Sequence, residues 1–93
     1  MELPVDYFKT SPRKRKKVRE EYCELKNWLC WYCKHDLREK PPSFITKKKY
    51  DRKLFPAFFL SYPIHLQHNQ ETNMTEGAVH ARCNAVLWQY EGR

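Results

Sequence analysis

The stretch PIHLQHNQETNMTEGAVHARCN, residues 63–84, decides the fold of this chain. The residues YPIHLQH at 62–68 alternate in polarity, which predicts a short strand, and AVHA at 78–81 predicts a second one. Between them, NQETNMTEG is rich in the residues that form turns. The stretch therefore predicts a β-hairpin.

The end of the same stretch also carries possible metal ligands. His80 and Cys83 are separated by two residues, and so are Cys30 and Cys33 earlier in the chain. Such spacing lets both side chains of a tight turn reach one tetrahedral zinc ion, at about 2.3 Å from sulfur and about 2.0 Å from nitrogen. Two pairs together predict a structural zinc site that ties the first helix of the domain to the last.

Other interpretations of these ligands remain open. The C-x-x-C pair can be free and lie beside an unrelated core histidine, and His35 or Cys23 can replace His80 as a ligand. A chain of 93 residues buries only a modest core, so a metal is a common supplement to its stability. We favour the zinc site for this reason.

The rest of the chain predicts one domain over 12–93, preceded by an arm over 1–11. Ser11 is a good helix cap and Pro12 suits a first helical position, and a stripe of apolar residues predicts a basic helix over 12–29. The stripe consists of Val18, Tyr22, Leu25 and Leu29. The knuckle CWYC and a Pro-Pro loop follow this helix.

Two further groups of apolar residues predict how the domain is completed. Val86, Leu87 and Tyr90 predict an amphipathic last helix that ends at Gly92. The segment 44–62 is rich in aromatic residues, which we expect to cover the small core rather than to stack on bases. These aromatic residues are Phe55, Phe58, Phe59 and Tyr62.

The charge of the chain points to a polyanionic partner. The formal net charge is +7, and basic residues cluster in RKRKKVR at 13–19 and KKKYDRK at 47–53. We expect these runs to contact the phosphates of DNA, without sequence specificity. The proposed contact residues are Arg13, Lys14, Lys17, Lys47, Lys48 and Lys49. Alternatively, the runs are solvated faces or part of a disordered arm.

The sequence also bears on compartment. No apolar secretory segment opens the chain, and no apolar run approaches the ~18 residues of a membrane span. We therefore expect reduced cysteines, no membrane partner and a soluble, cytoplasmic protein.

The motifs CWYC, IHLQHNQETNMTEGAVHARCN and AVLWQYEG, in this order, resemble the HNH or ββα-metal nucleases, in particular the bacteriophage branch around recombination endonuclease VII. The resemblance covers about half of the chain. It implies an α+β ββα-metal domain with a structural zinc, and a metal-dependent DNA endonuclease activity that uses Mg²⁺ or Mn²⁺. It also implies a viral protein that acts in the cytoplasm of the host cell.

The resemblance further implies the site residues. His68 matches the general base at the end of the first hairpin strand, and Asn84 matches the amide ligand of the catalytic ion. Gln67 stands where the family has an acidic metal ligand, which implies that Gln67 and Asn84 hold the catalytic ion and that this ion has no carboxylate ligand. Strand alternation puts Gln67 on the same face as His65 and opposite His68, so His65 can serve as a ligand instead.

Two alternatives to the endonuclease remain. The first is a catalytically weak or inactive protein of the same fold that binds nucleic acid or protein, which the missing carboxylate favours. The second is a small zinc-ribbon-like interaction protein unrelated to nucleases.

Overall fold

A computed structural model describes residues 2–92 of the chain, and the ends of the predicted arm and domain at residues 1 and 93 lie outside this range. Its elements are α1 (Pro12–Leu25), α2 (Ser43–Thr46), η1 (Arg52–Leu54), η2 (Phe59–Ser61), β1 (Ile64–His68), β2 (Thr75–His80) and α3 (Ala81–Glu91). The predicted α+β class and the predicted order of helix, knuckle, strand, strand and helix are confirmed. No helix in the described range is long and apolar enough to cross a membrane.

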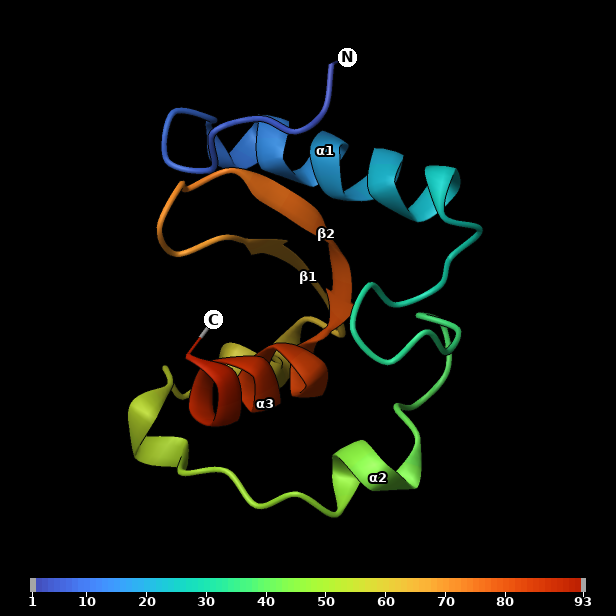
Figure 1. Cartoon of the computed structure of the whole chain (residues 1–93), viewed down its shortest axis with the longest axis vertical. Helices are drawn as coiled ribbons and strands as arrows, with labels where there is room; N and C mark the ends of the chain where they lie inside the picture. Colours follow the sequence, from blue (N-terminus) through green and yellow to red (C-terminus); the bar gives the residue numbers. More distant parts are fainter. Residues whose placement is uncertain (1, 93) are drawn as a thin grey trace.

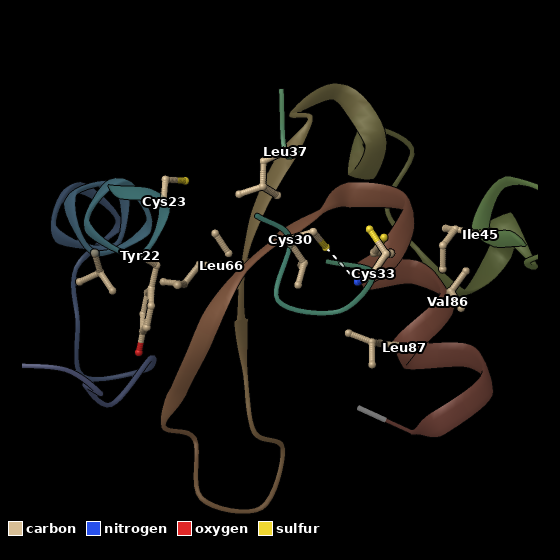
Figure 2. Packing of buried hydrophobic residues seen from close by; sticks show 13 residues of the cluster. Tyr22, Cys23, Cys30, Cys33, Leu37, Ile45, Leu66, Val86 and Leu87 are labelled. Carbon is tan, nitrogen blue, oxygen red and sulfur yellow. Dashed lines mark hydrogen bonds between the residues drawn. The ribbon is translucent and has the colours of Figure 1, made fainter. Parts of the chain in front are cut away.

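The centre of the fold is the β1–β2 hairpin, which lies between α1 and α3 (Figure 1). The two strands are antiparallel, with Leu66 opposite Ala78 and His65 opposite Val79. Because neighbouring residues of a strand point to opposite faces, these two pairs belong to different faces of the sheet. Leu66 faces Tyr22 of α1 (Figure 2), and His65 faces α3, where it contacts Asn84.

The buried core therefore has two parts, one on each face of the hairpin. In Figure 2, Tyr22, Cys23 and Leu66 lie between α1 and the sheet, while the knuckle cysteines, Val86 and Leu87 lie on the side of α3. Cys23 of α1 is fully buried. Burial is also the main reason that the pKa of its thiol is raised.

Helix α1 begins as predicted but ends earlier. The Ser11 hydroxyl accepts a hydrogen bond from the Lys14 backbone at 3.3 Å, and Pro12 is the first helical residue. The helix ends at Leu25 and not at residue 29, because Asn27 and Trp28 adopt left-handed backbone angles that no α-helix accommodates. Leu25 and Leu29 are consequently 61% and 46% exposed, so the prediction that they continue the buried stripe was wrong.

Helix α3 follows β2 without a loop and ends at Gly92, as predicted. Gly92 adopts a positive φ of 68°, a conformation that glycine reaches without strain. Val86 and Leu87 are buried, while Tyr90 is half exposed and does not belong to the apolar face.

The aromatic residues of 44–62 do not cover the core, contrary to the prediction. Phe58 and Tyr62 are 66% and 67% exposed. The segment contains only single turns of helix, and such short elements present no continuous apolar face to the sheet. Phe55 and Phe59 instead pack on each other at 4.7 Å, and Phe59 meets the His65 ring edge-on at 4.7 Å.

The N-terminal arm is paired with the end of the hairpin. The Thr75 amide donates to the Val5 carbonyl at 2.9 Å, and the Tyr7 amide donates to the Asn73 carbonyl at 2.8 Å. Asp6 and Met74 form an antiparallel bridge between these two bonds. The arm therefore lies against the hairpin and beside α1.

The knuckle leaves no room for a side chain at Gly77. A Cβ atom added there would lie 2.9 Å from the Cβ and Cδ1 atoms of Trp31, which the knuckle holds in place. We expect Gly77→Ala to lower the free energy of unfolding by about 1–3 kcal/mol, as overpacking of a rigid contact does. Chemical denaturation will measure the change. In a Trp31→Ala background the same substitution should cost little, and an equal cost in both backgrounds would contradict the steric explanation.

Candidate metal centre and the adjoining cleft

The structure brings together the four predicted zinc ligands, all of them buried. The ligand atoms of Cys30, Cys33, His80 and Cys83 lie within 4.8 Å of one another. The Cys33 and Cys83 sulfurs lie 3.5 Å and 3.6 Å from Nδ1 of His80. Sulfur and nitrogen ligands of one tetrahedral zinc ion are about 3.5 Å apart, given their usual bond lengths. The cluster can therefore hold a structural ion such as zinc.

The His80 ring is oriented for metal binding. Its Nε2 lies 2.9 Å from the carbonyl oxygens of Asp36 and of Glu39. Carbonyl oxygens only accept, so the ring carries its proton on Nε2 and leaves the Nδ1 lone pair facing the sulfurs. His80 is also the residue before α3, and its side chain caps no helical amide. Its role in this place is thus to present Nδ1 to the cluster.

The sulfurs are close enough to perturb one another. A hydrogen bond from Cys83 lowers the pKa of Cys30 to about 4, against the effect of burial. The same contact is the main reason that the pKa of Cys83 is raised, since proton donation holds it in the thiol form. A buried group of thiols that stabilises negative charge is the environment in which a cation binds as the neutralising partner.

The knuckle is attached to the sheet by its backbone. The Trp31 amide donates to the Ala78 carbonyl at 2.9 Å, and the Cys30 amide donates to the His35 carbonyl at 2.8 Å. An ion at the cluster therefore joins the knuckle, the end of β2 and the start of α3.

The substitute ligands are not members of the cluster. The His35 side chain lies beside the Cys33 carbonyl instead, and Cys23 lies on α1.

The cluster predicts different outcomes for two cysteine substitutions, and the one at Cys23 serves as the control. Cys33→Ser should lose most of the bound zinc and unfold the domain, because zinc binding of this kind contributes on the order of 10 kcal/mol to folding. Cys23→Ser removes an equally buried thiol outside the cluster, and it should retain one zinc per chain. Atomic emission and circular dichroism will measure both. A folded Cys33→Ser protein with full zinc content would refute the assignment.

Asn84, the residue after the last zinc ligand, forms a second polar contact with the hairpin. Its Nδ2 lies 3.1 Å from Nδ1 of His65. Its Oδ1 is buried and has no hydrogen-bond partner within residues 2–92. A buried acceptor without a partner costs about 1–3 kcal/mol, so such atoms mark places where water or an ion binds.

The His65 ring lies in an environment that favours its neutral form. Burial is the main cause that lowers its pKa, and the positive charge of Arg19 acts in the same direction. Hydrogen bonds with the backbone of Phe59 and of Tyr62 act in the opposite direction and raise the pKa of His65. A neutral imidazole at physiological pH can accept a proton, which a general base must do.

The structure does not bring the predicted base, His68, to Asn84 through any described contact. A register shift separates Gln67 from His68, and the His68 ring stacks on Tyr7 at 4.1 Å. Gln67 is buried, and its Nε2 donates to the His68 carbonyl at 2.9 Å. Gln67 and His68, the predicted partners of Asn84, thus contact the hairpin and the arm. His65 is the residue that contacts Asn84. Strand alternation was the signal in the sequence that pointed to His65.

A cleft of about 350 Å³ opens beside the pair of His65 and Asn84. It runs along β1, which is the free edge of the two-stranded sheet, and it is lined by residues of the arm, α1, β1 and α3. Arg15 and Arg19 of α1 line it, and no acidic residue does. Sequence analysis did not select these arginines within the first basic run. Their spacing of four places them on one face of α1, next to the buried Val18, and this was the available signal.

The six predicted phosphate contacts are all exposed. The two groups lie toward opposite ends of the long axis, with α1 at one end and the chain after α2 at the other (Figure 1). The backbone of the second group is attached to α3, since Arg82 donates to the Lys48 carbonyl at 3.1 Å and Gln89 to the Lys49 carbonyl at 3.3 Å. These lysines therefore have fixed backbones and side chains that reach solvent.

The chain matched no protein-family model, no curated protein and no solved structure. The described geometry defines a small α+β domain with a Cys3His group able to hold zinc.

Proposed function

We propose that this chain is a metal-dependent DNA endonuclease of the ββα-metal class, with a structural zinc at the Cys3His cluster. The observation that carries the proposal is the contact between His65 and Asn84. It joins the first strand of the hairpin to the following helix, one residue after a zinc ligand. The cluster thus positions Asn84, and the hairpin positions a neutral imidazole against it.

In this proposal His65, and not His68, is the general base. In the described structure the lone pair of His65 Nδ1 faces Nδ2 of Asn84. In this proposal Nδ1 exchanges that hydrogen bond for a water molecule, and it takes a proton from the water as the water oxygen attacks phosphorus in line. The bond from phosphorus to the 3′ oxygen then breaks, and the leaving oxygen takes a proton from solvent. Burial lowers the pKa of both His65 and His68, so both rings favour the neutral form. What supports His65 is its contact with Asn84.

Asn84 is the residue that would hold a Mg²⁺ or Mn²⁺ ion. Its buried Oδ1 lacks a hydrogen-bond partner within the described range, and an amide oxygen is a hard ligand that such ions accept. A bound divalent ion would neutralise charge on the phosphate and on the leaving oxygen. Gln67 is held by the His68 carbonyl, so water and DNA phosphate would complete the coordination shell.

One observation favours a second function. No carboxylate lines the cleft at His65 and Asn84, so divalent ions have little to attract them before DNA binds. A protein that keeps this domain and its exposed basic groups as a nucleic-acid binding module would look the same in these respects. The two functions differ in whether the bound DNA is cut.

Cleavage by two histidine variants tests the proposal. In a plasmid nicking assay with Mg²⁺, Mn²⁺ or Ni²⁺, His65→Ala should lower the rate by ~10² to 10⁴, the usual contribution of a general base. His68→Ala removes a ring that packs on Tyr7, and it should lower the rate by less than about tenfold. Both variants should keep zinc and bind DNA. Loss of activity in His68→Ala alone would return the base role to His68, and an inactive wild type with every ion would favour the binding module.

The basic groups make a separate prediction. If the three lysines at 47–49 each contact a phosphate, replacing them with glutamine should flatten the plot of log affinity against log salt by up to about 3 units. Replacing Lys9, Lys26 and Lys40 removes the same charge outside both basic runs and should change this slope much less. Fluorescence anisotropy with a DNA duplex will measure the slopes. Equal slopes for both triple variants would exclude specific phosphate contacts at 47–49.

A further inference from the structure

We propose that the cleft at His65 and Asn84 is a phosphate-binding site in which Arg19 and Arg15 of α1 hold the phosphate. That the bound phosphate is the scissile phosphate of DNA rests on the proposed function, whereas the binding of phosphate in the cleft does not. The site gives α1 a second role, different from contacts made by its exposed basic residues.

The composition of the cleft selects an anion. It offers two guanidinium groups, the ring of His65 and the amide of Asn84, and no carboxylate. A phosphate carries oxygens that accept hydrogen bonds from the guanidinium groups and from the second N–H of the Asn84 amide, beside the His65 ring. The same set repels a free divalent cation, so phosphate is the better match for the cleft before any ion enters.

Arg15 is held in place by the arm. Its Nε donates to the Tyr7 carbonyl at 2.9 Å, and its guanidinium lies 4.0 Å from the centre of the Tyr7 ring. One edge of the guanidinium is therefore fixed, while its remaining N–H groups stay available to the cleft. The arm in turn is paired with the hairpin through Val5 and Tyr7, so this arginine has little freedom to lose on binding.

Arg19 lies one helical turn further along the same face of α1. Its side chain is half-buried, and its guanidinium forms no hydrogen bond or ion pair with any residue in 2–92. Burial is the main cause that lowers the pKa of His65, and the charge of Arg19 acts in the same direction. A half-buried guanidinium that faces a cleft without a carboxylate is suited to a bidentate contact with phosphate.

This site also addresses the missing carboxylate ligand of the proposed enzyme. A diester held by two arginines brings its own oxygens to Asn84, where they can serve as the charged ligands that the protein lacks. The arginines would in addition stabilise the negative charge that develops on the phosphate during attack, an effect that is commonly worth 10² or more in rate for a single donor. In this arrangement, substrate binding precedes metal binding.

Binding of inorganic phosphate to the zinc-loaded protein tests the site without any need for cleavage. Titration at constant pH, without Mg²⁺ or Mn²⁺, should shift the imidazole NMR resonances of His65 in a saturable way. Arg19→Gln should weaken phosphate at least about tenfold, and Arg19→Lys should weaken it less because it keeps the charge but not the planar fork. Lys40→Gln removes one exposed charge outside the cleft and should bind phosphate as the wild type does. Zinc content will verify that each variant is folded, and Arg15→Gln provides a second test of the cleft.

The outcomes separate this inference from the proposed endonuclease. If phosphate binding requires Arg19 but DNA is not cut, the phosphate site is supported and the proposed endonuclease activity is refuted. If DNA is cut but Arg19→Gln and Lys40→Gln bind phosphate equally, the inference is overturned while the endonuclease stands. Absence of any saturable shift at His65 would likewise overturn it. When the wild type cuts DNA, Arg19→Gln should lower kcat at saturating DNA, whereas a role in duplex attraction alone would raise only KM.

Discussion

The Cys3His cluster is the constraint on which the other parts of this domain depend. It draws ligands from the knuckle at 30–33, from the last residue of β2 and from the first turn of α3. The knuckle is also bonded to β2 through the Trp31 amide and the Ala78 carbonyl, and β2 passes into α3 without a loop. The carbonyls that orient His80 come from the chain just after the knuckle. A bound ion would therefore join these three segments through four ligands.

The position of Asn84 follows directly from this constraint. As the neighbour of Cys83, it is presented at the first turn of α3, toward the face of the hairpin that carries His65. Because the sheet has only two strands, β1 is an open edge, and side chains from both of its faces can meet there. Arginines from the α1 side and the polar pair from the α3 side therefore line one cleft. A wider sheet would separate them.

The charges of the domain divide into two kinds. The lysines and arginine expected to contact phosphate are exposed, lie in two separate groups and are suited to attracting a polyanion from solution. Arg15 and Arg19 are partly buried and directed by their helix toward a polar pair, so they suit the recognition of a single phosphate group. The proposed functions differ in what happens after this recognition. The proposed cleavage requires His65 and a divalent ion, whereas binding requires only the arginines and the exposed lysines.

Local patterns in the sequence determined the elements and the zinc ligands. Alternation between 62 and 68, the turn residues that follow, the cap at Ser11 and the glycine at 92 act over a few residues, and each predicts its element. The bounds of the second strand differ, because β2 begins at Thr75, inside the predicted turn, and ends at His80. The two ligand pairs were also readable, because their spacing is a local property. The sequence did not predict the end of α1, because the residues with left-handed backbone angles there are Asn27 and Trp28 and not glycines.

The tertiary structure alone decided which side chains meet. His68 stacks on Tyr7 because the register shifts after Gln67 and the arm pairs with the hairpin. His65 lies on the other face of the strand, where it contacts Asn84. Whether an aromatic residue is buried likewise depends on the surface that its segment meets, and Phe58 and Tyr62 remain 66% and 67% exposed. The grouping of Arg15 and Arg19 with residues some 45 to 70 positions away depends on how α1 crosses the open edge of the sheet. Contacts between distant segments arise from the packing of whole elements. A pattern within one segment indicates the face on which a side chain lies, but not the segment that this face meets.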